Sequence, residues 1–341
     1  MEYYLQKKKI IKNREMRNFT FKGLFLEVVF IVLGSLSIQA ADGDLITKQI
    51  TIKLEEAGTL PSKIGDTKKY KITNLKIMGE INGTDLRFIR EMAGCDYNGK
   101  GTEGKLATLD LSEAKIVKGG DYYYNYYGCY TLDDVIGNQA FDGCSSLTSL
   151  TLPSSVTSIG SSAFSGCSGL TSLTLPSSVT SIEWSAFSGC SGLTSLTLPS
   201  SVTSIGESAF SGCSGLTSLT LPSSVSSIGE SAFSGCSGLS SIYVNWESPL
   251  SIDASTFEDA NTGKCILYVP KGTYDDYWIS NWGIFENIVE YDPTGIDHIT
   301  TSGEAKEISR YAADGQRLEV PAKGLNIVKY SDGCVKKVVV Q

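Results

Sequence analysis

Hydrophobic residues recur along the middle of the chain with a period of 23 residues. The first copy begins at Ile136 and reads IGNQAFDGCSSLTSLTLPSSVTS. Near copies begin at Ile159, Ile182, Ile205 and Ile228. The last of these five copies loses the pattern after Ile242. A fixed period of this length is typical of repeat architectures, in which each copy is one structural unit.

Each copy contains three short hydrophobic segments separated by serine-rich turns. The first segment has the pattern Leu-x-x-Leu-x-Leu and alternates at its end, which predicts a half-buried strand that the following proline stops. The second pairs a valine with an isoleucine, and the third contains Ala-Phe, a glycine and a cysteine. One full set is Leu170, Leu173, Leu175, Pro176, Val179, Ile182, Ala186, Phe187, Gly189 and Cys190. One copy cannot bury these side chains alone, so we expect stacked copies to share a continuous core.

This pattern predicts a mostly β leucine-rich-repeat solenoid with short turns and helical pieces. We expect a right-handed stack with a strand spacing of roughly 4.8 Å. Divergent leading repeats are predicted around Ile72–Ile77 and Leu106–Leu111, with a helix over Asp85–Met92 between them. After the array, we expect a strand over Leu267–Pro270 and an aromatic cover over Tyr274–Phe285, because terminal repeats must be atypical to prevent end-to-end growth.

The composition shifts along the chain predict six regions. These are a signal peptide over 1–40, divergent repeats forming an N-terminal cap over 42–118, a tyrosine-rich insertion over 119–135, the repeats over 136–249, a C-terminal repeat cap over 250–293, and a small C-terminal β segment over 294–341.

The N-terminal region has the pattern of an export signal. Its apolar run, Val28–Ile38, has eleven residues, whereas a bilayer span needs about 20. Seven basic residues precede the run, and Ala40 and Ala41 follow it. This order predicts cleavage near Ala40, with Met16 as an alternative start; an uncleaved signal anchor is the alternative interpretation. No membrane span is expected beyond Ala41.

The repeat also resembles a known family. Its Leu-x-x-Leu-x-Leu-Pro-x-Ser-Val and Ala-Phe-x-Gly-Cys motifs are similar to the BspA-type leucine-rich repeat. The stretches Ile72–Asp85, Leu109–Leu111 and Tyr311–Val340 resemble surface proteins of that family from Bacteroides and Prevotella relatives. The resemblance implies an adhesin-like protein, secreted or on the outer surface of a Gram-negative bacterium, that binds host or neighbouring-cell proteins. Its C-terminal part implies a sorting or attachment tail, and the family supplies no catalytic residues.

The charge of the chain is acidic and uneven. The formal net charge is −8, but residues 1–40 hold seven basic and three acidic residues, so the remainder carries −12. This balance argues against nucleic-acid binding, which needs a basic face. The segment Ile136–Pro249 contains no Lys or Arg, and its charged residues are Asp142, Glu183, Glu207, Glu230 and Glu247.

No set of residues suited to catalysis or metal binding is found. The chain has one histidine, His298, which argues against His-based metal sites and nucleophile pairs. Gly99–Lys105 matches a phosphate-binding loop, but Leu106 stands where Ser or Thr would hold magnesium. We therefore expect no catalytic residues, no cofactor and no metal.

Five of the nine cysteines recur at the repeat period: Cys144, Cys167, Cys190, Cys213 and Cys236. Stacked sulfur atoms should lie about one strand spacing apart, which is too far for a disulfide. We interpret them as buried small hydrophobic residues, with disulfides as the less favoured alternative. A Cys95–Cys129 pair stays open.

Two aromatic features are candidate ligand contacts. Trp184 is compared with Gln139, Ser162, Ser208 and Ser231 in the other copies, which predicts an exposed anchor or a neutral substitution. Six tyrosines lie between Tyr122 and Tyr130, and Tyr123 and Tyr126 are candidates for binding. A packed insertion that caps the repeats is the equal alternative.

The strands carry hydroxyl groups in register. The candidate contacts are Ser172, Thr174, Ser195, Thr197, Ser218 and Thr220. Such a face suits hydrogen bonding to proteins or glycans, or it is simply a solvated strand face. A solenoid hydrolase would need paired carboxylates or Arg and Lys on this face, and neither is present.

The leading hypothesis is a non-catalytic surface or secreted protein that mediates adhesion by binding host or bacterial surface and matrix proteins. The alternatives are a hydroxyl face that contacts glycan or ice and, least favoured, a polysaccharide-active enzyme.

Overall fold

The computed structural model describes residues 45–125, 128–292, 307–312, 317–318, 323–330 and 335–340. The chain divides into Met1–Leu45 and Ile46–Gln341. Only Leu45 of the first unit is described, so the predicted signal peptide lies outside the described residues.

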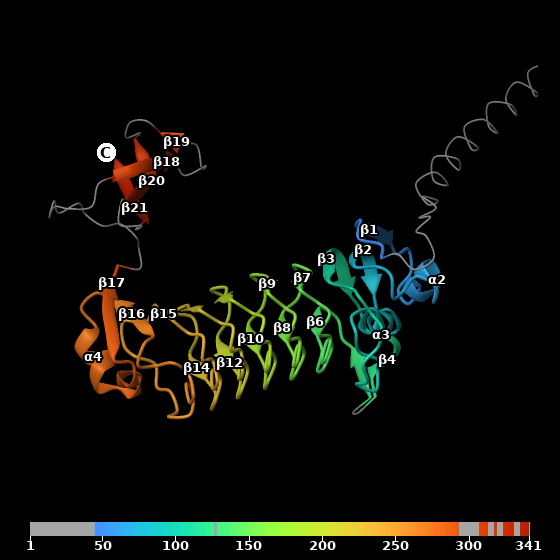
Figure 1. Cartoon of the computed structure of the whole chain (residues 1–341), viewed down its shortest axis with the longest axis horizontal. Helices are drawn as coiled ribbons and strands as arrows, with labels where there is room; N and C mark the ends of the chain where they lie inside the picture. Colours follow the sequence, from blue (N-terminus) through green and yellow to red (C-terminus); the bar gives the residue numbers. More distant parts are fainter. Residues whose placement is uncertain are drawn as a thin grey trace, which may run out of the picture. The chain divides into compact units, whose positions relative to one another are not determined.

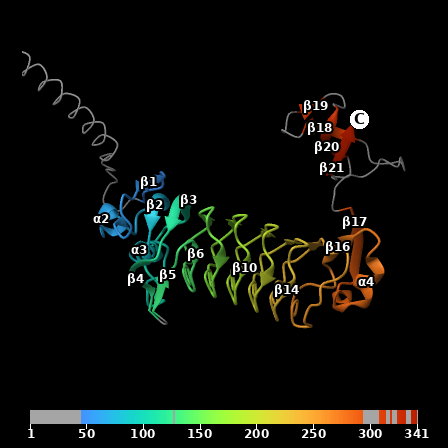
Figure 2. The same ribbon diagram turned by 180° about the vertical axis from the view of Figure 1, so that it is seen from behind.

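The repeats coil into a solenoid with two rows of parallel strands (Figure 1). The row that we call the front face carries the Leu-x-Leu strands of the repeats: β7 (Ser149–Thr151), β9 (Ser172–Thr174), β11 (Ser195–Thr197), β13 (Ser218–Leu221) and β15 (Ser241–Val244). The back sheet, visible from the other side in Figure 2, consists of β6 (Val135–Ile136), β8 (Ser158–Ile159), β10 (Ser181–Ile182), β12 (Ser204–Ile205) and β14 (Ser227–Ile228). The predicted repeat solenoid is confirmed.

A third segment, which contains the Ala-Phe pair, the glycine and the cysteine of each copy, closes each coil. We call it the Phe segment. Its amides donate to the next coil, as in Phe141 N to Ala163 O at 2.7 Å and Phe164 N to Ala186 O at 2.7 Å. Six phenylalanine rings stack with centroids 5.1–5.4 Å apart: Phe141, Phe164, Phe187, Phe210, Phe233 and Phe257. The stack of Phe on Phe follows the prediction, and it extends one coil beyond the five copies found in the sequence.

The close stacking of the coils also explains why one position differs between the first copy and the later copies. A Cβ on Gly169 would lie 2.3 Å from Ser145 O of the preceding coil, so only glycine fits there. The first coil has Ser146 at this position, next to the N-terminal flank instead of another repeat. There the Ser146 hydroxyl donates to Gly104 O at 2.9 Å.

The N-terminal flank continues the front face. Strands β1 (Ile50–Lys53), β2 (Asn74–Ile81) and β3 (Thr108–Ile116) pair in parallel, and β3 pairs with β7. The helices are α2 (Leu60–Ile64) and α3 (Gly83–Met92), and a hairpin follows, made of β4 (Gly119–Tyr124) and β5 (Cys129–Thr131). The predicted helix is confirmed, because α3 buries Leu86, Ile89 and Met92.

Side chains of this flank satisfy the open backbone edge of the first coil. In later coils the carbonyls of Ser161, Ala163 and Ser165 accept amides of the coil before them. Their counterparts in the first coil are Asn138, Ala140 and Asp142. Tyr123 donates its hydroxyl to Asn138 O at 2.9 Å, and the fully buried Arg90 donates to Ala140 O and Asp142 O, both at 3.1 Å. Two side chains thus replace the hydrogen bonds of a missing coil.

Aromatic residues close the other end. Strands β16 (Ile266–Pro270) and β17 (Asn287–Tyr291) extend the front face, with α4 (Tyr274–Ile279) and the 3-10 helix η1 (Asn281–Ile284) between them. Trp282 is fully buried, and its Nε1 donates to Leu250 O at 2.8 Å. Trp278, by contrast, is 52% exposed. The predicted aromatic cover therefore depends on Trp282 and not on Trp278.

The C-terminal segment forms a separate antiparallel sheet in the order β19-β18-β20-β21. Its strands are β18 (Glu307–Ala312), β19 (Arg317–Leu318), β20 (Gly324–Tyr330) and β21 (Val335–Val340). His298 lies outside the described residues.

Replacing Arg90 by methionine should lower the free energy of unfolding by about 3 kcal/mol or more, because buried carbonyls lose charge-assisted hydrogen bonds. Urea denaturation of Arg90→Met and of the wild-type chain measures this difference. The matched control is Lys48→Met at an exposed position, which should change stability by less than about 0.5 kcal/mol. An equal urea midpoint for Arg90→Met and wild type would contradict the role of Arg90.

Candidate functional site

The candidate hydroxyl groups lie in register on the front face, but their columns are interrupted. Ser149 pairs with Ser172 and Thr151 with Thr174, while Ser195 pairs with Ser218 and Thr197 with Thr220. The front face is two five-stranded sheets, β1-β2-β3-β7-β9 and β11-β13-β15-β16-β17, and no ladder joins β9 to β11. The hydroxyl groups are therefore in register within each sheet, and the columns are interrupted at this junction. Four hydroxyl-bearing residues beside the gap are exposed: Ser172, Thr174, Ser195 and Thr197.

The interruption coincides with an unusual coil. Glu183 stands where the other four copies have glycine: Gly137, Gly160, Gly206 and Gly229. A Cβ on Gly206 would lie 2.6 Å from the carbonyl carbon of Glu183, so this position faces the backbone of the preceding coil closely. The Glu183 N to Ile159 O hydrogen bond is 3.0 Å, against 2.7–2.8 Å at Gly160, Gly206 and Gly229. The hydrogen bonds beside it keep their usual length, with Ser162 N to Trp184 O at 2.8 Å and Phe164 N to Ala186 O at 2.7 Å, so this coil accommodates Glu183 while the back sheet and the Phe segment stay paired.

The comparison of Trp184 with the other copies was wrong by one residue. The amide of Ser185 donates to Glu207 O, and the amide of Ser208 donates to Glu230 O. Trp184 O accepts from Ser162 N in the same way. The residues equivalent to Trp184 are therefore Asn138, Ser161, Glu207 and Glu230, and we call this set the Trp184 column.

The residues with which the sequence analysis compared Trp184 are in fact equivalent to Ser185. These residues share a positive φ of 51–56°: Gln139, Ser162, Ser185, Ser208 and Ser231. This left-handed position comes directly before the Ala-Phe pair, and it marks the register that the sequence comparison missed.

Trp184 is exposed to solvent. Half of its surface (50%) is accessible, and its neighbour Glu183 is exposed as well. Glu207 and Glu230 of the same column are also exposed. Within the described residues, the side chains of Glu183, Glu207 and Glu230 make no hydrogen bond or ion pair. The column therefore presents an indole ring next to carboxylates that have no cationic partner.

The tyrosine cluster is largely a packed element. Tyr123 is only 1% exposed, and burial raises its pKa. It cannot serve as a ligand contact, so that prediction is wrong. Tyr122 packs against Tyr97 in a tilted arrangement, with ring centroids 5.9 Å apart, and the Arg87 guanidinium lies 3.6 Å from the Tyr97 ring centroid. Tyr130 is 55% exposed, and Tyr126 lies outside the described residues.

The five repeated cysteines are buried free thiols, which agrees with their interpretation as small core residues. Four of them donate to the phenylalanine carbonyl of the preceding coil at 3.1–3.3 Å: Cys167, Cys190, Cys213 and Cys236. Burial raises the pKa of Cys144, Cys190 and Cys236 to about 12. Cys95 and Cys129 are also free thiols.

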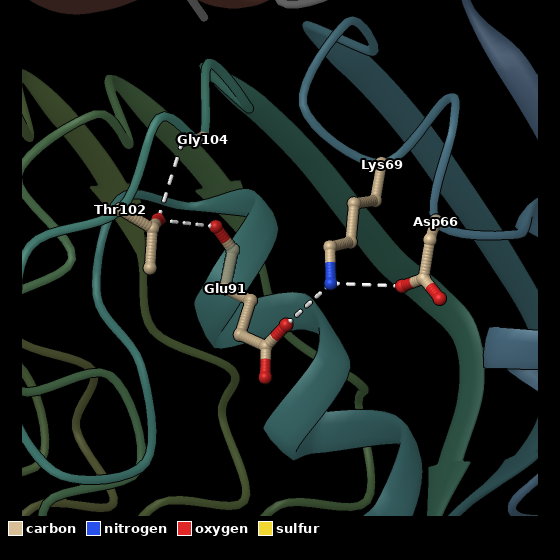
Figure 3. Close-up of polar contacts among 5 residues, drawn as sticks. All are labelled: Asp66, Lys69, Glu91, Thr102 and Gly104. Atoms are coloured by element: carbon tan, nitrogen blue, oxygen red, sulfur yellow. Dashed lines mark hydrogen bonds and ion pairs between the residues drawn. The ribbon is translucent and has the colours of Figure 1, made fainter.

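An open cleft of about 310 Å³ lies beside α3 in the N-terminal flank. Figure 3 shows its ionic network, in which Lys69 Nζ bridges Asp66 at 2.9 Å and Glu91 at 2.8 Å. Burial lowers the pKa of Lys69, but its hydrogen bonds to Glu91 and Asp66 outweigh burial and raise the pKa above its ordinary value. Thr102 donates to Glu91 O at 2.6 Å, which fixes the Gly99–Lys105 loop to the helix. The charged groups of this network are paired with one another and the loop is tied to the helix, so the cleft is best explained as a structural joint.

The described residues contain no group of three or more His, Cys, Asp or Glu side chains placed to hold a metal ion. In the same residues no helix combines the length and apolar character that crossing a bilayer requires.

Three features were missed by sequence reasoning. Arg90 gives no sequence signal beyond a charge in an amphipathic helix. Glu207 and Glu230 were counted as charges, and the correct register would have placed them beside Trp184. The exposed aromatic residues on α4, Tyr274 and Trp278, were assigned to the cover of the last coil.

Comparison with known proteins identifies the repeat. Residues 134–263 match the BspA type leucine rich repeat region in six copies. The match ends 14 residues beyond the predicted array, and its extra length contains Phe257 of the ring stack. No curated protein matches the chain.

Several solved structures are similar. A leucine rich repeat protein of T. pallidum is 31% identical, with 47% of this chain and 64% of that chain covered and a TM-score of 0.33. The chain thus spans about 64% of that protein's length. The pneumococcal vaccine antigen PcpA is 17% identical, with 72% and 68% covered and a TM-score of 0.41. A leucine-rich repeat protein from Bacteroides ovatus is 18% identical, with 65% and 84% covered and a TM-score of 0.22.

The buried thiols should make stability depend on pH above neutrality. Their folded pKa lies above the unfolded value of about 8.5, so their contribution is complete below that pH and is lost as pH rises towards about 12. Cys190→Ala lacks one such thiol. Between pH 8.5 and 10, the free energy of unfolding of this variant should therefore fall by about 2 kcal/mol less than that of the wild type. Urea denaturation with reductant at both pH values measures the difference.

Val202→Ala is the matched control, because Val202 is equally buried and does not titrate. Its stability deficit should be the same at both pH values. Parallel pH curves for Cys190→Ala and wild type would show that the thiol does not titrate differently on folding.

Proposed function

Residues 134–263 are a BspA-type leucine-rich repeat region, and on that premise we propose that this chain is a non-catalytic surface or secreted protein that binds other proteins. Its partners are surface or matrix proteins of a host or of neighbouring bacterial cells, and its role is adhesion. The resemblance of the flanks to exported surface proteins supports this location on a Gram-negative cell. The export pattern over 1–40 independently supports secretion from the cell.

The exposure of Trp184 carries the proposal. The exposed side chains of the repeats are mostly Ser and Thr, and Trp184 is the large apolar exception, with half of its surface accessible. Tryptophan is enriched among the residues that dominate binding energy at protein interfaces. The stacked phenylalanine and cysteine positions hold this surface rigid, so little entropy is lost when a partner binds.

A non-catalytic role fits the chemistry of the front face. Its exposed groups at the gap are the hydroxyls of Ser172, Thr174, Ser195 and Thr197. Hydrolysis of a glycan requires paired carboxylates, and the front strands of the repeats have none.

The substitution Trp184→Ala should weaken binding to a protein partner by roughly 30-fold, as expected for a central aromatic anchor. The purified chain is screened against host matrix proteins, and the affinity of each hit is measured by surface plasmon resonance. Trp278→Ala is the matched control, because Trp278 is equally exposed (52%) but lies on the C-terminal cap. No hit, or an equal affinity for Trp184→Ala, counts against this version of the function.

The exposure of the four hydroxyl groups beside the gap favours a second candidate, a face that contacts glycan or ice. The double variant Thr174→Lys/Thr197→Lys should then abolish glycan binding or ice-growth inhibition, because two long charged side chains cover the face. Trp184→Ala should leave this activity intact, which separates it from protein adhesion. Glycan arrays and ice recrystallisation assays provide the readouts.

A further inference from the structure

The register of the Trp184 column defines the chemistry of the partner that docks on it. Trp184, Glu207 and Glu230 occupy equivalent positions in three consecutive coils, and each backbone carbonyl accepts the corresponding amide of the coil before it. Successive members therefore lie about one strand spacing, roughly 4.8 Å, apart along the solenoid. Glu183, next to Trp184 in the chain, is exposed as well.

The carboxylates of this column are not needed to build the coil. Ser161 occupies the same position in the second coil, which stacks with the same hydrogen-bond pattern. Asn138 in the first coil has a structural contact, since its Oδ1 accepts from Ser161 N at 2.9 Å. Among the described residues, no side-chain hydrogen bond or ion pair of Glu207 or Glu230 fulfils a comparable role.

The negative charge is also uncompensated in its surroundings. The segment from Ile136 to Pro249 contains no Lys or Arg, so no cation of the array itself can neutralise the column. Charges close together repel one another, and a cation brought by a partner relieves that repulsion. An anionic partner would be repelled.

We infer that Trp184 and the neighbouring carboxylates Glu183, Glu207 and Glu230 form a docking surface for a cationic segment of a partner protein, an inference that rests on the proposed adhesion function. An arginine or lysine side chain places its charge over the indole face in a cation–π contact. A second basic residue on the same segment then reaches the carboxylates one or two coils away. Arginine fits best, because its planar guanidinium stacks on the ring and pairs with a carboxylate in a bidentate geometry.

The probe is a fluorescent peptide of Gly, Ser and four Arg residues, compared with the same peptide in which Gln replaces each Arg. Fluorescence polarisation measures binding to the full chain at low and high salt. The Arg peptide should bind the wild-type chain and weaken as salt rises, since exposed charges are screened. The Gln peptide should bind at least about tenfold more weakly.

Two variants assign the binding to the column. Trp184→Ala and the double variant Glu207→Gln/Glu230→Gln should each weaken the Arg peptide by about tenfold. Glu247→Gln, which removes an exposed charge of the array outside the column, is the matched control and should bind like wild type. Urea midpoints equal to wild type will show that all variants are folded.

Several outcomes overturn the inference. These are no binding of the Arg peptide at about 1 mM, equal binding of the Gln peptide, equal binding by the double Gln variant, or a neutral oligosaccharide that displaces the peptide. Concentration-dependent self-association that the double Gln variant abolishes would overturn it in favour of a second copy. A protein partner found in the screen separates the two hypotheses. If Trp184→Ala abolishes its binding but the double Gln variant still binds it, the adhesion function is supported and the cationic nature of the partner is contradicted.

Discussion

Backbone hydrogen bonds between consecutive coils set a separation of about one strand spacing between equivalent residues of the repeat. Every side chain inside the solenoid must therefore fit against a copy of itself. Phenylalanine rings meet this condition by parallel stacking at 5.1–5.4 Å, and glycine does so where a Cβ would meet a carbonyl of the coil before. Cysteine satisfies it by donating its thiol to the preceding phenylalanine carbonyl. The regular sequence of the array is the consequence of this self-fit.

The same hydrogen bonds create two ends that a stack of identical coils cannot close. Unpaired backbone groups that are buried cost free energy, and exposed ones invite end-to-end growth. At the N-terminal end Arg90 and Tyr123 donate to the carbonyls that a missing coil would have paired. At the other end the indole and amide groups of Trp282 and Asn281 donate to Leu250 O and Ile252 O. At both ends, side chains thus donate the hydrogen bonds that backbone amides donate in the array.

The residues that differ from the repeat pattern can be interpreted through this condition of self-fit. Glu183 and Trp184 stand side by side in one coil, where the other copies have glycine followed by a polar residue. The front ladder is interrupted at that coil, between β9 and β11, while the back sheet and the Phe segment continue through it. The coil thus combines an interrupted front ladder, the exposed hydroxyl groups of Ser195 and Thr197 on the front face and an exposed indole. The other features on which the candidate functions depend lie on the coils next to it.

The repeat period, the solenoid, the helix over α3 and the buried thiol interpretation were all accessible from the sequence, because copies in register repeat the same local environment. The sequence did not show that Tyr123 is buried, since the hairpin that contains it folds back onto a carbonyl edge distant in the chain. It also did not reveal the role of Arg90, whose partners lie 50 and 52 residues away.

The 23-residue period by itself aligns Trp184 with Glu207 and Glu230, and the inter-coil hydrogen bonds agree with that register. The interruption between β9 and β11 was visible only in the structure. The sequence by itself determined what repeats, because identical residues at a fixed period must stack. Only the tertiary structure decided what happens where the repeat ends or is broken, because there each group takes its partner from a different part of the chain.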